Sequence, residues 1–202
     1  MFRALTRALV VAALLLPLAG RAALAEGSPT QVIQEFYGVL LDAMKNADKL
    51  GFEGRKQNLA PAIDKTFDLG LMTRLSIGPQ WQNLSPEDQQ KLTQAFRDMT
   101  IATYAGRFDG YSGEKFEVAP EPADTPGGKV VQTKLVQSNG EPIQLNYLMR
   151  DNGQGWHAID VFLKGTVSEL ATRRSEYTSV LRRDGPAGLL KLMAQKAAEA
   201  KG

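Results

Sequence analysis

Cysteine is absent from this chain of 202 residues, and histidine occurs only once, at position 157. Without cysteine there can be no disulfide bond, no thiol nucleophile and no thiolate metal ligand. A single histidine excludes the paired histidines of zinc sites, and no carboxylates have the spacing of a calcium loop. A lone histidine in a strand is more often structural than catalytic, which is how we interpret His157. The sequence therefore predicts no metal site and no cofactor.

Motifs for catalysis and for phosphate binding are missing as well. Ser76, Ser112 and Ser138 lack the Gly-x-Ser-x-Gly context of a nucleophile elbow. The glycine pair Gly110 and Gly113 is too closely spaced for a phosphate-binding loop. We therefore expect no catalytic residues in this chain.

Long apolar runs are confined to the N-terminus. Two arginines precede the apolar run Ala8–Ala19, which is too short to cross a bilayer, and Ala23-Leu24-Ala25 matches a small-x-small cleavage site. We expect residues 1–25 to be a cleavable signal peptide and residues 26–202 to form one exported domain. An uncleaved amphipathic anchor is the alternative, and a lipoprotein is excluded because it would need a cysteine.

The basic character of the whole sequence comes mainly from this leader. Three of the 24 basic residues, Arg3, Arg7 and Arg21, lie in the first 25 positions, so the remainder carries 21 basic against 22 acidic residues. A net charge of about −1 leaves no basic excess for phosphate backbones. We therefore expect no nucleic-acid partner.

Hydrophobic periodicity predicts helices first, then strands, then helices. Ser28-Pro29 and Ser85-Pro86 are typical helix starts, and helical spacing follows each of them. From Gly110 the period changes to two, which predicts antiparallel strands at residues 115–119, 129–137, 142–150 and 154–164. A capping box at Thr166 predicts the start of the next helix, and Asp184–Pro186 a turn before the last one. The prediction is a single α+β domain: an antiparallel sheet of four strands, or slightly more, covered by helices.

Two separated sets of residues resemble one known family. The first is Phe67-Asp68, Arg74, Ile77-Gly78, Trp81, Ser85-Pro86-Glu87, Phe96 and Tyr104. The second is Trp156, Asp160-Val161, Gly165, Ser168, Arg174-Ser175-Glu176-Tyr177, Gly185, Leu189-Leu190 and Leu192. Together they resemble the pattern of the periplasmic MlaC, or toluene-tolerance, lipid carriers, over almost all of the chain after the leader.

One departure from that pattern indicates a branch of the family. Where the family usually carries Asn-Tyr-Arg, this chain has Thr172-Arg173-Arg174, and one extra residue separates Gly165 from Ser168. This version resembles the HpnM branch, which is associated with hopanoid biosynthesis. The resemblance therefore implies either a phospholipid or a hopanoid-type lipid as cargo.

The resemblance also implies how such a protein works. It implies a monomeric periplasmic domain whose sheet and helices enclose an apolar pocket, with lipid tails inside and the head group at the mouth. The implied partners are an inner-membrane ABC or RND-type transporter complex, an outer-membrane lipoprotein and, transiently, the membrane. Such a shuttle supports the lipid asymmetry of the outer membrane and has no enzymatic activity.

Two alternatives remain open from the residues alone. The first is a non-enzymatic scaffold that docks on a transporter and has a filled core, with no internal cavity above a few water volumes. The second is an enzyme of small apolar molecules, which would need a polar residue such as Asp160 or His157 pointing into a cavity.

Candidate pocket residues follow from the inward positions of the predicted strands and helices. A one-residue register error would move every strand choice to the other face. The predicted lipid-binding residues are Phe36, Leu40, Met72, Leu75, Phe96, Met99, Val131, Leu135, Ile143, Leu145, Tyr147, Ile159, Val161 and Leu170.

Charged residues interrupt two of these apolar patterns. Arg174 falls on the apolar stripe of the helix after Gly165, and Asp160 interrupts an apolar strand. Because an unpaired buried charge is costly, we expect the two to pair with each other or with Asp68. The alternative places Arg174 at the pocket mouth, where it would contact a lipid head group. Arg74 carries the same two interpretations.

Overall fold

The computed structural model describes residues 27–202, so the predicted signal peptide at residues 1–25 lies outside the described part of the chain. Five α-helices form most of the molecule: α1 (Pro29–Lys45), α2 (Ala47–Thr66), α3 (Leu69–Ile77), α4 (Pro86–Arg107) and α5 (Glu169–Glu199). A short 3-10 helix, η1 (Gly78–Asn83), connects α3 to α4. The strands are β1 (Lys115–Val118), β2 (Ala123–Thr125), β3 (Gly128–Val131), β4 (Thr133–Val136), β5 (Pro142–Asp151), β6 (Trp156–Leu163) and β7 (Val167–Ser168).

All ladders between these strands are antiparallel, and the α+β prediction is confirmed. The long strand β5 is central: β6 pairs with one edge of it, and β4 and β3 pair with successive stretches of its other edge. Strands β1 and β2 extend the sheet beyond β4 and β3, and β7 extends it beyond β6. The four predicted strands are all present. The sheet is larger because one short strand forms at residues 123–125 and another at residues 167–168.

The predicted strand at residues 129–137 is divided into β3 and β4 by a break at Gln132. Side chains replace ladder bonds there: the Thr133 amide donates to Asn146 Oδ1 at 3.2 Å, and the Thr133 hydroxyl donates to the Leu145 carbonyl. The two halves of β5 therefore pair with different strands, β4 at Pro142–Gln144 and β3 at Tyr147–Met149.

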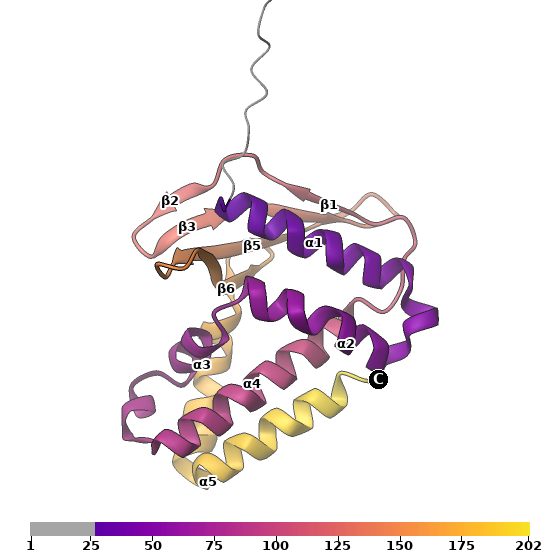
Figure 1. Ribbon diagram of the computed structural model, residues 1–202. Helices are drawn as coiled ribbons and strands as arrows, with labels where there is room; N and C mark the ends of the chain where they lie inside the picture. Colours follow the sequence, from indigo (N-terminus) through magenta and orange to yellow (C-terminus); the bar gives the residue numbers. More distant parts are fainter. Residues whose placement is uncertain (1–26) are drawn as a thin grey trace, which may run out of the picture.

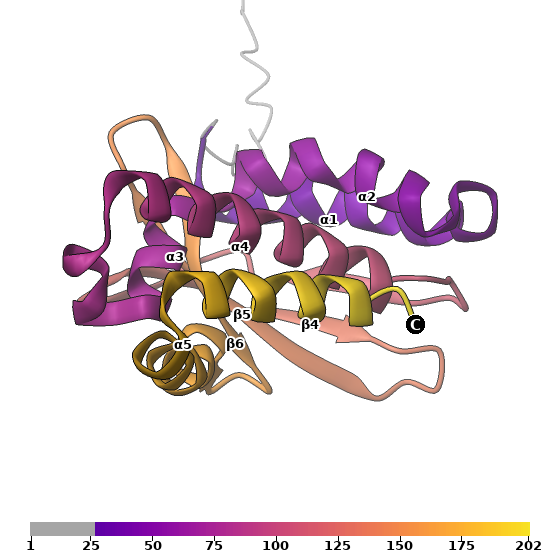
Figure 2. The same ribbon diagram turned by 90° about the horizontal axis from the view of Figure 1, so that it is seen from below.

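Helices cover one face of the sheet, which we call the inner face. Helices α1, α2, α4 and the second part of α5 lie side by side, with α1 nearest to the sheet (Figures 1 and 2). The connection between α2 and α3 touches the sheet directly, since the Asp68 amide donates to the Ala158 carbonyl at 3.0 Å. Lys134 and Gln144 point to the opposite face of the sheet and are exposed, because no helix covers them there.

Both predicted Ser-Pro helix starts are confirmed. Ser28 Oγ accepts from the Gln31 amide at 3.1 Å, and Ser85 Oγ accepts from the Asp88 amide at 3.1 Å. Proline at the first helical position removes an N–H group that has no partner within the helix, so the same Ser-Pro pair begins both helices. Helix α1 then buries Ile33, on the face that the helical spacing predicted.

The predicted capping box at Thr166 is wrong by two residues. The N-cap of α5 is Ser168, whose Oγ accepts from the Ala171 amide at 2.9 Å. The chain stays extended to that point because β7 pairs with the end of β6. The short hairpin between β6 and β7 therefore delays the start of the helix.

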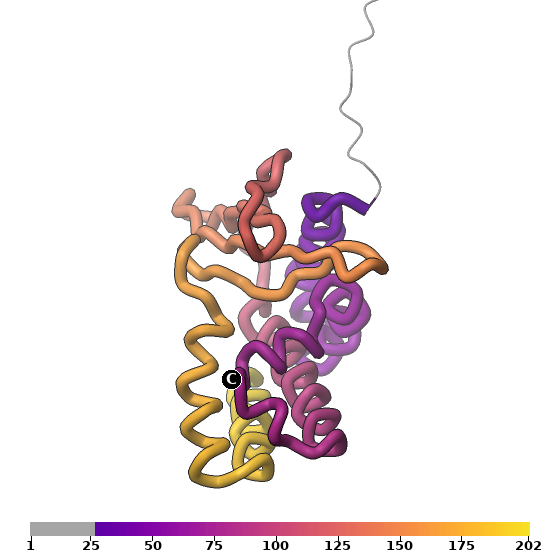
Figure 3. The backbone as a smooth tube through the Cα atoms, turned by 90° about the vertical axis from the view of Figure 1, so that its left-hand side faces the viewer, coloured from indigo at the N-terminus to yellow at the C-terminus, as the bar shows by residue number. Residues whose placement is uncertain are grey.

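Single glycines interrupt the helical backbone within α2 and α5. Gly51 (φ 58°, ψ −178°) and Gly185 (φ 67°, ψ −169°) occupy a backbone region that is essentially restricted to glycine. The predicted turn at Asp184–Pro186 is therefore present, although it occupies a single residue. The two parts of α5 run side by side in opposite directions (Figure 3), and Lys196 Nζ pairs with Glu176 Oε1 across them at 3.0 Å.

A β-bulge shifts the register between β5 and β6. Leu148 pairs with Asp160 and Met149 pairs with Ala158, so Ile159 has no partner. Ala158 and Val161 consequently share the inner face, and Ile159 is buried but lies outside the main apolar cluster. The predicted alternation that assigned Ile159 to the inner face is wrong for this reason.

Candidate functional site

A cavity of about 340 Å³ lies between the inner face of the sheet, α4 and the start of α5. The sheet contributes apolar side chains from β4, β5 and β6, and α4 contributes one wall along its last three turns. Most of the lining is apolar or aromatic, and the polar side chains include Gln137, Arg107, Glu169 and Arg173. The lining comprises Phe67, Met72, Phe96, Thr100, Thr103, Tyr104, Arg107, Phe108, Leu135, Gln137, Ile143, Leu145, Tyr147, Val161, Leu163, Glu169, Leu170 and Arg173.

Aromatic rings close the cavity on the side of α1. Phe67 packs near Tyr104 and Tyr147, with ring centroids 5.7 and 6.2 Å away. Burial raises the pKa of both Tyr104 and Tyr147 above the ordinary tyrosine value, so both phenols stay neutral at physiological pH. This end of the cavity is therefore uncharged and built from flat apolar surfaces.

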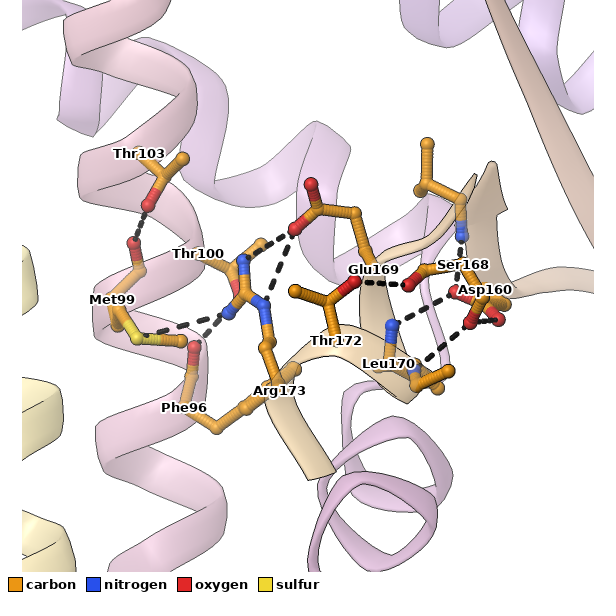
Figure 4. A network of polar contacts seen from close by, with 12 residues as sticks. Phe96, Met99, Thr100, Thr103, Asp160, Ser168, Glu169, Leu170, Thr172 and Arg173 are labelled. Atoms are coloured by element: carbon orange, nitrogen blue, oxygen red, sulfur yellow. Dashed lines mark hydrogen bonds and ion pairs between the residues drawn. The ribbon is translucent and has the colours of Figure 1, made fainter. Parts of the chain in front are cut away.

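Arg173 brings a positive charge to the wall between α4 and α5 (Figure 4). Its Nη2 lies 3.2 Å from Glu169 Oε2, its Nη1 lies 3.7 Å from Met99 Sδ, and its guanidinium carbon lies 5.5 Å from the centre of the Phe96 ring. Burial opposes the charged form, but Tyr177 and Glu169 outweigh it, so the pKa of Arg173 is raised. The guanidinium is thus a fixed, paired charge at the edge of an apolar space.

A second depression, which we call the polar cleft, adjoins the cavity. It has a volume of about 640 Å³ and lies between the end of α4, the first turns of α5 and the end of α5. The residues Thr103, Arg107, Glu169 and Arg173 line both spaces. An apolar compartment and a charged compartment therefore share one wall.

Asp160 anchors the start of α5 to the sheet (Figure 4). Its Oδ1 accepts from the amides of Val161 and Leu170 at 2.8 and 3.2 Å, and the Ser168 hydroxyl donates to its Oδ2. These hydrogen bonds satisfy a buried carboxylate without a cation. They also fix the turn that carries Glu169 and Arg173 to the cavity wall.

Eight of the fourteen candidate pocket residues line the cavity: Met72, Phe96, Leu135, Ile143, Leu145, Tyr147, Val161 and Leu170. The other six lie outside its lining. Phe36, Leu40, Met99 and Val131 belong to the filled core, Leu75 packs beside that core, and Ile159 is displaced by the bulge. Binding of lipid by the eight lining residues stays a prediction.

The expected pairing of Arg174 with Asp160 or Asp68 is wrong. Arg174 lies on the exposed side of α5, where its Nε and Nη2 donate to the Leu75 carbonyl at 3.0 and 2.7 Å, and it does not line the cavity. Asp68 instead caps α3, accepting from the Leu71 amide at 2.8 Å. Arg74 is exposed on α3 and does not line the cavity either.

Several residues of the cavity lining were not predicted from the sequence. Leu163 continues the period-two pattern of Val161, and Phe108 continues the stripe of α4, so both could have been included. Arg173 lies three residues after the buried Leu170, about one helical turn, but the prediction placed the neighbouring Arg174 on the apolar stripe instead. Glu169 and Thr100 carried no local signal.

The described residues 27–202 contain no group of side chains suited to hold a metal ion. No helix in that part of the chain has the length and hydrophobicity that crossing a bilayer requires. Neither Asp160 nor His157, the two polar residues that the enzyme hypothesis named, lines the cavity. The filled-core hypothesis predicted no cavity above a few water volumes, and the cavity of about 340 Å³ contradicts it.

Comparisons with known proteins agree with this geometry. Residues 34–195 match the family model described as "MlaC protein". Among solved structures, the phospholipid-binding protein from Ralstonia solanacearum, in complex with a phospholipid, superimposes with a TM-score of 0.75. Its sequence is 22% identical, and the match covers 87% of this chain and 99% of that chain, so the two share a fold. No curated protein matches this sequence significantly.

Proposed function

The chain belongs to the MlaC family, and on that premise we propose that it is a periplasmic carrier that shuttles lipid between the inner and outer membranes. The observation that carries the proposal is the cavity of about 340 Å³, because its lining is largely apolar and it holds no charged side chain except along the wall shared with the polar cleft. The eight predicted residues that line it are the proposed contacts of the acyl chains.

The energetics of transfer support a carrier. Each methylene removed from water contributes about 0.8 kcal/mol, so a chain of about fifteen carbons gains on the order of 10 kcal/mol on entering the cavity. A protein that carries such a chain needs an apolar space and no catalytic group. Release then has to be driven by a membrane or a partner, because the cavity alone would retain its ligand.

For the cargo, phospholipid and hopanoid-type lipid are the two candidates. The similar Ralstonia solanacearum structure holds a phospholipid, which supports the first. The Thr172-Arg173-Arg174 sequence at the start of α5, which resembles the HpnM branch, supports the second. Arg173 contacts the cavity directly, so this difference lies where a ligand would meet the protein.

We also propose how the protein is exported and with which partners it exchanges lipid. Residues 1–25 act as the export signal, and the remaining domain acts as a monomer that exchanges lipid with an inner-membrane ABC or RND-type transporter complex and an outer-membrane lipoprotein. Ile143 lines the cavity and is 37% exposed, and Val167, beside the lining residue Leu163, is 50% exposed. These two side chains supply apolar surface for transient contact with a membrane or partner at the rim.

Two adjacent residues of β4 provide a direct test. Leu135 points into the cavity, whereas Lys134 is exposed on the opposite face. Leu135→Trp should fill part of the cavity and reduce the amount of co-purified lipid at least tenfold. Lys134→Trp adds the same side chain outside and should leave lipid loading unchanged.

The measurement is native mass spectrometry of protein purified from its own host, followed by extraction and identification of the lipid. Phospholipid or hopanoid in the wild-type protein, and its loss in Leu135→Trp alone, is the expected result. A wild-type protein that carries no lipid and takes up none from labelled vesicles would overturn the proposal.

A further inference from the structure

Two tyrosines bring hydroxyl groups to the aromatic end of the cavity, on the side of α1. Tyr104 on α4 and Tyr147 on β5 both line the cavity, and Tyr147 is only 1% exposed. Burial raises the pKa of each, so both stay neutral phenols. A polar group in an apolar space costs free energy unless it has a hydrogen-bonding partner. The partners of these two hydroxyls therefore determine what this end of the cavity can bind.

The other hydroxyl groups of the lining are already in use. The Thr100 hydroxyl donates to the Phe96 carbonyl at 2.8 Å, and the Thr103 hydroxyl donates to the Met99 carbonyl at 2.7 Å. Both hydrogen bonds return to the backbone of α4, one turn earlier. Among the described residues that line the cavity, the two phenols are therefore the hydroxyls that can respond to a guest.

A third tyrosine connects these phenols to the sheet. The Tyr37 hydroxyl lies 2.6 Å from Thr133 Oγ1, and the Thr133 hydroxyl donates its proton to the Leu145 carbonyl. Because Thr133 has one hydroxyl proton and a carbonyl can only accept, Tyr37 must be the donor to Thr133. The Tyr37 oxygen is thus left as an acceptor.

Tyr147 lies next to both of the other tyrosines. Its ring centre is 5.8 Å from that of Tyr37. Burial is the largest cause of the raised pKa of Tyr147, and the neighbouring Tyr104 and Tyr37 raise it further. Tyr147 can therefore donate its proton to Tyr37, and Tyr104 can donate its proton to Tyr147. When every hydroxyl donates in the direction of the Leu145 carbonyl, the Tyr104 oxygen remains as the acceptor at the cavity end.

We propose that this end of the cavity is a subsite for a hydroxyl group carried on the apolar part of the cargo, as in a hydroxylated acyl chain. The inference rests on the proposed function, because it assumes an apolar guest in the cavity. The guest hydroxyl donates to the Tyr104 oxygen and so completes a series of hydrogen bonds that ends at the Leu145 carbonyl. The subsite lies among the tail-binding residues, away from the wall that the cavity shares with the polar cleft.

The direction of the series selects among polar groups. A guest alcohol supplies the donor that the Tyr104 oxygen can accept, whereas a ketone of the same size offers only a further acceptor. To bind the ketone, Tyr104 would have to withdraw its proton from Tyr147. The rings of Phe36, Phe67 and Phe108 lie within 5.8 Å of the Tyr104 ring, so the surroundings of the subsite are aromatic. The subsite therefore favours a hydroxylated chain over a keto chain of equal length.

The test uses the full chain, stripped of lipid, with hexadecanoic acid and its 15-hydroxy, 15-oxo and 2-hydroxy derivatives as probes. Displacement of a fluorescent fatty acid measures the dissociation constant of each. The wild type should bind the 15-hydroxy derivative roughly tenfold more tightly than the 15-oxo derivative, the size of one net hydrogen bond. Tyr104→Phe removes only the acceptor oxygen. It should weaken binding of the 15-hydroxy derivative roughly tenfold and leave hexadecanoic acid unchanged, because the buried guest hydroxyl loses its partner.

Controls separate the hydrogen bond from structure and from the carrier function. Tyr111→Phe removes the hydroxyl of an exposed tyrosine outside the cavity lining and should change no affinity. The 2-hydroxy derivative keeps its hydroxyl beside the carboxylate, so its binding should not respond to Tyr104→Phe. The subsite is overturned if Tyr104→Phe binds the 15-hydroxy derivative as tightly as the wild type does, or weakens all probes alike. A wild type that binds the 15-oxo derivative as tightly as the 15-hydroxy derivative would overturn it too. A wild type that binds none of the probes would instead overturn the proposed function.

Discussion

The two halves of strand β5 have the same alternation of side chains and different surroundings. In the half that pairs with β3, Met149 is fully buried, and Tyr147, although it also lines the cavity, is 1% exposed. In the half that pairs with β4, Ile143 is 37% exposed and Leu145 is half-buried, and both face the cavity. Helix α1 covers the first half, whereas space remains between the second half, α4 and α5.

The difference shows what the alternation of apolar residues in a strand does and does not determine about its surroundings. It determines which face of a strand avoids water, because alternate side chains point the same way. It does not determine whether that face meets protein side chains or an unfilled space. We call the two regions the filled half and the hollow half, and each of the following predictions compares them.

The largest effect should come from truncating the filled half. Met149→Ala should lower the free energy of unfolding by about 2–5 kcal/mol, because it leaves a void in a close-packed core. Leu145→Ala in the hollow half should lower it by only about 1 kcal/mol, since its side chain already borders open space. Urea denaturation of lipid-free protein measures both. Equal losses at the two positions would show that the hollow half is packed in solution.

Asp160 provides the next largest effect, because it connects the sheet to the helix that walls the hollow half. Asp160→Ala leaves the Val161 and Leu170 amides without their acceptor and should destabilise the protein by roughly 2–3 kcal/mol. It should also reduce lipid loading, since the start of α5 loses its anchor. Asp124→Ala, an exposed carboxylate on β2, serves as the control and should change neither quantity. A variant that loses stability but loads lipid normally would show that the anchor at Asp160 is not needed for lipid binding.

Alkaline pH should destabilise the fold through its buried tyrosines: Tyr37 is buried on α1, and Tyr104 and Tyr147 line the cavity. Burial raises the pKa of Tyr37 to about 12, and its hydroxyl lies 2.6 Å from Thr133 Oγ1. The unfolded phenol loses its proton near pH 10, so between pH 10 and 12 the folded state binds more protons than the unfolded state and stability falls as pH rises. The loss should reach roughly 2 kcal/mol. Denaturation of wild type and Tyr37→Phe across this range measures it, and an unchanged slope in the variant would contradict the assignment.

The smallest effect should be a local gain of order on lipid binding. Amide hydrogen exchange should slow by about tenfold in β4 and the adjoining half of β5, because the ligand replaces missing packing there. Exchange in β3 and the other half of β5 should stay as it was. Uniform slowing over both halves would mean that lipid stabilises the fold as a whole and not the hollow half.

The sequence predicted those features that are set by neighbouring residues. The helix starts at Ser28 and Ser85, the change of period at Gly110 and the α+β class all follow from local patterns. The break at Gln132 could not be predicted in this way, because it depends on the hydrogen bond between Thr133 and Asn146 of the next strand. The bulge at Ile159 likewise depends on how two strands align, which a single strand does not encode.

For the candidate site, the sequence predicted much of the wall and little of its charge. Leu135, Leu145 and Val161 were identified by alternation. Arg173 was passed over in favour of Arg174, because both lie about one helical turn after Leu170 and only the contact with α4 distinguishes them. The polar cleft was not foreseen, since its members come from α2, α4 and both parts of α5, which only the tertiary structure brings together.

The reversal at Gly185 constrains one wall of the cavity. It ties the ends of the two parts of α5 to a common pivot, so neither part can slide along the other by a turn. The β4–β5 hairpin, which lines the same cavity, has no such tie, and its tip at Ser138–Gly140 is exposed.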